Sequence, residues 1–419
     1  MRAAWWKIVW VLAGCVMCGG VELKLPEKVR PIMDMVNAAP PEFGAAAIER
    51  LLESAHIDDV PTRRVLIEQA YQLGALAKDP WRPFALPDAG YAAGMHAHAG
   101  DLLLDRLSLQ LAAVQLMLPI DKHHAREMYL DIPKPTPPPL TCDDGYGGDF
   151  GEFYRTLALI LGETFTRAEK RHEDDIHLAI DYLNSIASPM QLLPALRMVV
   201  SLNMNPEEKH LLLVQLGSAM AAVQADDRSF LMVSAGLSVD VPRELVPSYQ
   251  RFVASRANAA PCAVAKKDDE AQSAEEKRIA SDEMKLMFKG GSLVSPGERQ
   301  SADWERRFDE FLNGMADWRQ GDGESDSAYY HRRMTVYESL LDVSSGATRA
   351  RLIDEMVGFA IQSNLLREAP AEWYFELKNA DDHVRGSSAN GPDVLDGFDR
   401  SGHPVLVLAS ALDRLLGRR

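Results

Sequence analysis

Apolar residues recur at helical spacing in one segment after another, and only short polar turns separate these segments. A strip at positions i, i+3, i+4 and i+7 marks the buried face of an amphipathic helix, whereas alternation with a period of two marks a strand. Alternating patterns are nearly absent, so we expect an all-α fold. Because helices with short connections pack antiparallel to their neighbours, the predicted architecture is an irregular helical-hairpin array, α-solenoid-like, or a multi-helix bundle.

Helix start signals support this prediction. Pro40 and Pro41 precede an apolar strip that begins at Phe43, and Asp58 or Asp59 can cap a helix that carries Pro61 in its first turn. A long helix is expected over residues 98–118 and a short one over 121–129. Further helices are predicted over residues 153–165, 174–187, 189–202, 206–225 and 228–237.

Changes in composition divide the chain into four parts. Residues 21–256 form the predicted N-terminal array, interrupted by a proline- and glycine-rich loop at 132–151. Residues 257–300, rich in Ala, Lys, Glu, Asp and Ser, indicate a charged linker that holds one solvated helix. Residues 301–419 form a second helical block, whose clearest unit is a helical hairpin over 327–366.

The first part, residues 1–20, has the pattern of a signal sequence: Arg2 and Lys7, then a short apolar stretch, then small residues. Residues 12–15 (LAGC) match a bacterial lipobox, in which Cys15 becomes the acylated first residue. Ordinary cleavage after Gly19 or Gly20 is the alternative, and a short core helix is a third interpretation. We therefore expect an exported protein of the periplasm or outer envelope, with a possible lipid anchor.

No apolar run approaches the roughly 20 residues that span a bilayer, so no transmembrane helix is expected in the mature chain.

The chain has 45 Lys and Arg against 61 Asp and Glu, a formal net charge of -16. Such a surface repels phosphate backbones and anionic lipids, which argues against nucleic-acid binding and against adhesion to anionic membranes.

Two cysteines remain after the signal sequence, Cys142 and Cys262. In an oxidising compartment such a pair can close a disulfide. The alternative is two separate buried thiols, because the sequence does not supply the Cα separation that a disulfide requires.

The loop that follows Cys142 is the most unusual stretch of the chain. Its carboxylates Asp143, Asp144, Asp149 and Glu152, with four glycines among them, could wrap a hard cation such as calcium. The order of acidic residues differs from that of an EF-hand, and a solvent-exposed loop without metal explains the composition equally. Calcium at these four side chains is therefore a hypothesis.

Two histidine groups resemble metal sites less closely. His172 and His177 are five residues apart, which rotates the second by about 140° around a helix, so both cannot face one zinc ion. His96 and His98 could approach His123 and His124 from a neighbouring helix, but no carboxylate lies at useful spacing. Surface histidines are the simpler interpretation of both groups.

Local catalytic signatures do not occur in the sequence. We find no Gly-x-Ser-x-Gly elbow, no Ser-x-x-Lys pair and no phosphate-binding loop, and so we assign no catalytic residue and no cofactor. An active site assembled from distant residues would leave no such signature. The aromatic strip Trp304, Phe308, Phe311, Met315 and Trp318, and the cluster Trp373, Tyr374 and Phe375, are interpreted as core rather than as an exposed binding surface.

Several short stretches resemble a family of uncharacterised exported proteins from acidobacteria. They are residues 104–110 (LDRLSLQ), 125–127 (ARE), 140–142 (LTC), 226–230 (DDRSF), 369–373 (APAEW) and 401–402 (SG). The resemblance runs from about Ile48 to the C-terminus. It implies an exported protein with helical architecture, and it implies no catalytic residues.

Together these features predict a non-catalytic cell-envelope protein whose helical surface binds another envelope protein, since stacked helical hairpins form long, shallow grooves. The alternative is an extracytoplasmic hydrolase or lyase with a dispersed active site on a helical scaffold. A third interpretation is a metal- or solute-binding module that uses the loop from Cys142 to Glu152.

Overall fold

The structure is a computed structural model. It describes residues 23–54, 57–77, 84–85, 102–137, 144–145, 150–223, 242–256, 326–341, 344–362 and 393–416, with single positions and short runs between 306 and 382. Helices dominate these ranges, which confirms the all-α prediction. The exception is one antiparallel pair of two-residue strands, β1 (Phe84–Ala85) and β2 (Asp144–Gly145).

The first described helices each begin with a proline in the first turn. They are α2 (Arg30–Ala38), α3 (Pro41–Glu53) and α4 (Val60–Leu76). At the start of α4 the Asp59 carboxylate accepts hydrogen bonds from the backbone N–H of Thr62 at 3.0 Å and from its hydroxyl at 2.7 Å. This satisfies a backbone donor that would otherwise lack a partner in the first turn.

The helix expected over 98–118 is shorter than predicted, because α7 begins at Arg106 (Arg106–Met117). Asp105 caps it by accepting from the Ser108 backbone N–H at 3.0 Å. Leu103 has a φ of 56°, a left-handed conformation that an α-helix cannot contain. The apolar spacing continues upstream of Asp105, but the backbone turns there. The next helix, α8 (Lys122–Asp131), corresponds to the short helix predicted over 121–129, and Asp121 caps it.

The middle of the chain continues as short helices in close succession. They are α9 (Phe150–Glu163), α10 (Arg167–Arg171), α11 (Asp174–Asn184), the 3-10 turn η1 (Pro189–Gln191), α12 (Leu192–Ser201) and α13 (Pro206–Ala222), then η2 (Arg243–Leu245) and α15 (Val246–Arg256). The prediction matches α9, α11, α12 and α13 within a few residues, and it missed α10 and α15. The predicted helix over 228–237 lies outside the described residues.

Four helices are described in the C-terminal region: α18 (Asp326–Leu341), α19 (Gly346–Gln362), α22 (Val394–Ser401) and α23 (Pro404–Leu415). The α18–α19 hairpin corresponds to the unit predicted over 327–366, and its turn uses Gly346 at a φ of 57°. Gly402, at a φ of 63°, ends α22 and allows α23 to begin at Pro404.

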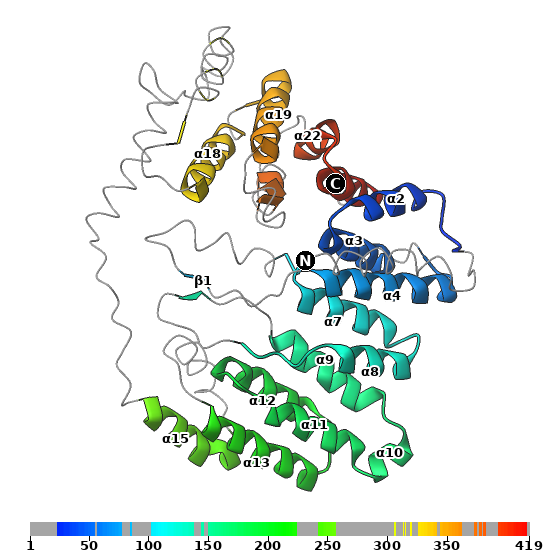
Figure 1. Cartoon of the computed structure of the whole chain (residues 1–419), viewed down its shortest axis with the longest axis vertical. Helices are drawn as coiled ribbons and strands as arrows, with labels where there is room; N and C mark the ends of the chain where they lie inside the picture. The colour runs from blue at the N-terminus through cyan, green and yellow to red at the C-terminus, as the bar shows by residue number, and fades with distance from the viewer. Residues whose placement is uncertain are drawn as a thin grey trace, which may run out of the picture.

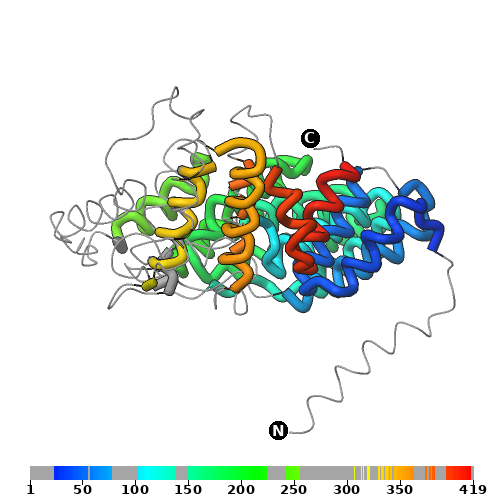
Figure 2. The backbone as a smooth tube through the Cα atoms, turned by 90° about the horizontal axis from the view of Figure 1, so that it is seen from above, coloured from blue at the N-terminus to red at the C-terminus, as the bar shows by residue number. Residues whose placement is uncertain are grey.

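The helices stack side by side in an arc, and their spatial order differs from their order in the sequence (Figure 1). Among described elements, the stack runs from α18 through α19, α22 and α23 to α2 and α3, and then through α4, α7, α8, α9, α12, α11 and α13 to α15. The last helix of the chain therefore packs against the first ones. Figure 2 shows the same neighbourhood from above, with α22 and α23 beside α2 and α3.

One hydrophobic core runs through this arc. A continuous cluster of buried side chains extends from Val29 to Leu412 and includes residues of both chain halves. Two of its helix pairs approach so closely that a glycine is required. A Cβ added at Gly74 would lie 2.9 Å from the Leu109 Cβ, and one at Gly397 would lie 2.4 Å from the Ile353 Cγ2.

Within the described part of the chain, no helix has the length and apolar character needed to cross a membrane.

Candidate functional site

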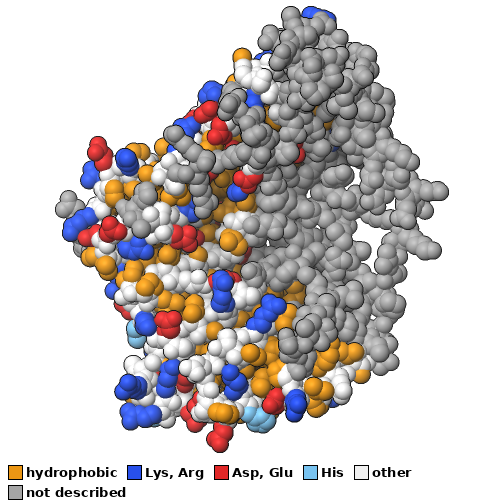
Figure 3. All heavy atoms as spheres, turned by 180° about the vertical axis from the view of Figure 1, so that it is seen from behind, with side chains coloured by type: hydrophobic (Ala, Val, Ile, Leu, Met, Phe, Trp, Pro, Cys, Tyr) orange, Lys and Arg blue, Asp and Glu red, His pale blue; other side chains and the backbone are white. Residues whose placement is uncertain are grey.

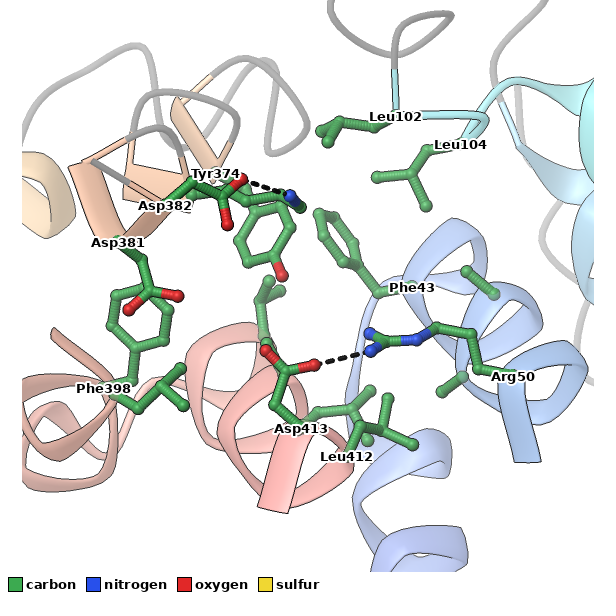
Figure 4. A pocket seen from close by; sticks show the side chains of 17 residues that line it. Phe43, Arg50, Leu102, Leu104, Tyr374, Asp381, Asp382, Phe398, Leu412 and Asp413 are labelled. Carbon is green, nitrogen blue, oxygen red and sulfur yellow. Dashed lines mark hydrogen bonds and ion pairs between the residues drawn. The ribbon is translucent and has the colours of Figure 1, made fainter. Parts of the chain in front are cut away.

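A pocket opens where the C-terminal helices meet the N-terminal ones. Its volume is about 240 Å³, and it lies between α3, α22, α23 and residues 374–382, with Leu102 and Leu104 at one side (Figure 4). Most of its wall is apolar and comes from Phe43, Leu104, Leu395, Phe398, Leu408 and Leu412. We call it the α3–α23 pocket.

An ion pair joins the two helices that frame this pocket. The Arg50 Nη2 of α3 lies 2.5 Å from the Asp413 Oδ1 of α23, although the two residues are 363 positions apart in the sequence. Both side chains are mostly covered, with 28% and 19% of their surface exposed. The partly covered position strengthens the attraction relative to a fully solvated pair.

Tyr374, Lys378, Asp381 and Asp382 close the opposite side of the pocket. The buried Trp373 side chain packs edge-on against the His403 ring, and Tyr374 packs edge-on against Phe43 at 5.3 Å between ring centroids. This confirms the prediction that Trp373 belongs to the core. Lys378 and Asp382 form an ion pair of 2.8 Å, whereas the neighbouring Asp381 side chain is buried.

Burial shifts the proton affinities of groups in and near the pocket. Desolvation raises the pKa of the Tyr374 hydroxyl, and the charge of Asp413 raises it further, so this phenol stays protonated and can donate a hydrogen bond. In Figure 4 the hydroxyl points into the space between Phe43 and Asp413. Burial also lowers the pKa of His403, which keeps its imidazole neutral at pH 7.

The arrangement has the properties of a small-molecule site. Such sites are concave and mostly apolar, and a few convergent polar groups fix the orientation of the ligand. Here the polar groups are a neutral phenol, two cations and three carboxylates, which lie on different sides of a mostly apolar cavity (Figure 4).

A second surface feature lies near the end of the arc that α13 and α15 form. Val200 of α12 and Leu211 and Val214 of α13 expose 53%, 45% and 50% of their surfaces, and we call these three residues the α12–α13 patch. Leu211 and Val214 share one helix face. Lys209 donates to the Val200 carbonyl at 3.0 Å and so joins the end of α12 to α13. Figure 3 shows one face of the molecule, on which hydrophobic side chains lie among charged ones over the whole described part.

The predicted calcium ligands are described only in part. Glu152 lies in the first turn of α9, where it accepts hydrogen bonds from Gln115 and Arg155. Asp144 is described only as backbone of β2, and Asp143 and Asp149 lie outside the described residues. No cluster of three or more His, Cys, Asp or Glu suited to a metal occurs among the residues that are described. Calcium binding at this loop stays a prediction.

The cysteine predictions also fall outside the described residues. Cys15, Cys142 and Cys262 all lie in segments without described structure. The lipid anchor and the disulfide therefore stay predictions.

The described histidines of the two predicted metal groups face carboxylates or solvent. His123 lies 3.4 Å from Glu127, and His124 lies 3.3 Å from both Glu68 and Glu127; His96 and His98 are outside the described residues. Exposed His172 ends α10 and exposed His177 lies in α11, with the left-handed Glu173 between them. The backbone break at Glu173 separates these two histidines further than one continuous helix would.

The sequence analysis missed the α3–α23 pocket. Its residues come from four segments of the chain, and no local motif connects Arg50 with Asp413. One sequence feature could have indicated the pocket. The aromatic residues Trp373 and Tyr374 lie close in the sequence to the acidic pair Asp381 and Asp382. In the strip around Trp304, only Met315 is described, and it is buried.

Comparison with known proteins gives no relative: no family model, no curated protein and no solved structure matches this chain.

Proposed function

We propose that the chain is a non-catalytic protein of the cell envelope whose helical array binds another protein. The observation that carries this proposal is the α12–α13 patch, because three aliphatic side chains on two helices that pack together are about half exposed. Single exposed apolar residues are ordinary on soluble proteins, whereas a group of them is typical of an interaction site.

The arc supports this proposal by its geometry. Stacked helices present a long surface on which a partner can contact many successive elements. The α12–α13 patch lies near one end of the stack, where only α15 follows in the described part of the array. Export is the second component of the proposal, and it rests on the signal pattern of residues 1–20, with lipidation at Cys15 or cleavage after Gly19 or Gly20 as the two alternatives.

Site-specific crosslinking in the native cell tests the interaction. A photo-crosslinking residue at position 211 is expected to give one discrete protein adduct in the envelope fraction. The matched control is position 130, because Leu130 in α8 is 47% exposed, close to the 45% of Leu211. Adducts equal at both positions, or none at 211, would end the proposal that the α12–α13 patch is an interface.

A charge substitution gives an independent readout. Val214→Glu should abolish the adduct at position 211, whereas Leu130→Glu should leave it unchanged.

The intact mass of the native protein tests export: a lipidated mass that begins at Cys15, or a start near Val21, supports it. A mass that includes Met1 to Gly20 would contradict it.

A further inference from the structure

The charged side chains that line the α3–α23 pocket are already engaged. Arg50 Nη2 lies 2.5 Å from Asp413 Oδ1, and Lys378 Nζ lies 2.8 Å from Asp382 Oδ2. Asp381 and Asp413 have further interactions, so neither carboxylate is free. The charged groups also lie on different sides of the pocket rather than together (Figure 4). An ionic ligand of either sign would therefore have to leave water and displace an existing partner, which is unfavourable.

Between these charged groups the wall of the pocket is apolar. The buried side chains of Phe43 on α3, Phe398 on α22 and Leu412 on α23 contribute to it from three helices. Covering such a wall with an uncharged body stabilises a complex in proportion to the apolar area that is removed from water. The wall thus favours a ligand whose main part is hydrocarbon.

Tyr374 supplies the neutral polar side chain of the described lining. Its ring packs edge-on against Phe43 at 5.3 Å between centroids, and its hydroxyl points into the space between Phe43 and Asp413 (Figure 4). Burial raises the pKa of this phenol, so the hydroxyl keeps its proton at neutral pH and is a hydrogen-bond donor. An acceptor oxygen on a ligand would find its partner here.

The size of the pocket restricts the ligand to a small molecule. An apolar cavity of about 150 Å³ is large enough to bind benzene, whereas sites for drug-sized ligands have volumes of roughly 300–1,000 Å³. The α3–α23 pocket, at about 240 Å³, lies between these sizes. It therefore matches one ring, or an aliphatic body of similar size, with a short substituent.

We propose that the α3–α23 pocket binds a small uncharged molecule with a ring-sized apolar body and one acceptor oxygen. The body lies against Phe43, Phe398 and Leu412, and the oxygen accepts a hydrogen bond from the Tyr374 hydroxyl. This site is separate from the α12–α13 patch, and the proposal does not depend on a protein partner.

Four planar probes of similar size test the ligand class on the full chain. Acetophenone is uncharged and has a carbonyl acceptor, and isopropenylbenzene is its hydrocarbon isostere. Benzamidine and benzoate have the same ring with a cationic and an anionic head group. Ligand-observed NMR titration measures the dissociation constant of each probe.

Acetophenone should bind about two- to tenfold more tightly than isopropenylbenzene, the gain expected from one neutral hydrogen bond. Both charged probes should bind at least about tenfold more weakly than acetophenone, because their head groups lose hydration without finding a free partner. Three results would overturn the proposal: tighter binding of a charged probe, acetophenone no tighter than the hydrocarbon, or no binding of acetophenone at millimolar concentration.

Substitutions locate the site. Tyr374→Phe removes only the hydroxyl, so acetophenone should lose its advantage while isopropenylbenzene binds as before. The matched control is Tyr249→Phe, because Tyr249 of α15 is also partly buried and does not line the pocket. Ala46→Leu adds carbons to a lining residue and should abolish binding of both probes, with circular dichroism to show that the helices remain folded. An advantage of acetophenone that survives Tyr374→Phe, or that Tyr249→Phe also removes, would contradict the assigned site.

Discussion

Two kinds of helix interface hold the array together. The contacts of α3 with α4, and of α7 with α8, join helices that follow each other closely in the chain. The contacts of α23 with α2 and α3 join the two ends of the chain, and the Arg50–Asp413 pair lies in that closure. Interfaces between successive helices follow from short connections, whereas the closure must offset the entropy of a very long loop. The closure is also where the α3–α23 pocket forms.

The largest effect is expected from two fully buried leucines, one on α7 and one on α23. Leu111 of α7 and Leu406 of α23 are both fully buried. Leu111→Ala and Leu406→Ala should each lower the free energy of unfolding by about 2–5 kcal/mol, through lost burial and a residual cavity. Chemical denaturation followed by circular dichroism measures this.

Hydrogen exchange then distinguishes the two interfaces. If the closure stabilises the N-terminal helices, Leu406→Ala will reduce amide protection in α2 and α3 as well as in α22 and α23. Protection in α2 and α3 that equals the wild type would show that the closure is energetically separate from the rest of the array.

A smaller effect is expected at the glycine contacts. Gly397→Ala places a Cβ 2.4 Å from the Ile353 Cγ2 and should destabilise by about 1–3 kcal/mol through overpacking. Gly358→Ala in α19 meets nothing within 4 Å and should instead stabilise by about 0.5–1 kcal/mol, because alanine is the better helix former. Opposite signs in thermal denaturation are the expected result. A stabilising Gly397→Ala would mean that α19 and α22 pack less closely than described.

The difference between local and long-range contacts explains how much of the fold could be predicted from the sequence. Asp59, Asp121 and Asn205 each cap a helix start by accepting from a backbone N–H two to three residues ahead. Such signals are local, and so the helices of the N-terminal array could be predicted within a few residues. The error at α7 has a local cause as well, since the left-handed backbone at Leu103 has no signature in a run of leucines.

The pocket could not be predicted, because it depends on which helices meet. Arg50 and Asp413 are each ordinary charged residues on an amphipathic helix, and only the packing of α23 on α3 brings them together. The metal hypothesis for the loop after Cys142 was based on its acidic and glycine-rich composition. Of its carboxylates, the side chain of Glu152 alone is described, and it forms hydrogen bonds with Gln115 and Arg155. Spacing predicts local structure well, and it predicts sites assembled from distant segments poorly.

Two ion pairs allow a direct comparison of the closure with a single exposed helix. The Arg50–Asp413 pair spans the closure, whereas Arg64 and Glu68 form an exposed pair four residues apart on α4. A double-mutant cycle with Arg50→Met and Asp413→Asn should give a coupling of about 1 kcal/mol, against ~0.3–0.5 kcal/mol for the helical pair. Equal couplings would mean that the covered position of the closure pair adds nothing to its strength.

The smallest effect is expected on how the free energy of unfolding depends on acidic pH, and it comes from the contact between α8 and α10. Glu169 accepts a hydrogen bond from Arg126 at 2.7 Å and one from the Thr166 backbone N–H at 2.6 Å, so it joins a distant contact to a local capping box. The Arg126 hydrogen bond, followed by those from Thr166, lowers the pKa of Glu169 from the ordinary 4.5 to about 2.

A carboxyl group with a lowered pKa in the folded state stabilises that state above its unfolded pKa, and the contribution is lost as the pH falls through the folded value. The contribution of Glu169 should therefore be complete above pH 4.5 and disappear toward pH 2. Glu169→Gln should flatten the dependence of the free energy of unfolding on pH within that window. Arg126→Met should flatten it in part, because the Thr166 bonds remain. If Arg126→Met removes the whole effect, the distant contact alone sets the pKa; a slope that Glu169→Gln leaves unchanged would place the acid sensitivity elsewhere in the array.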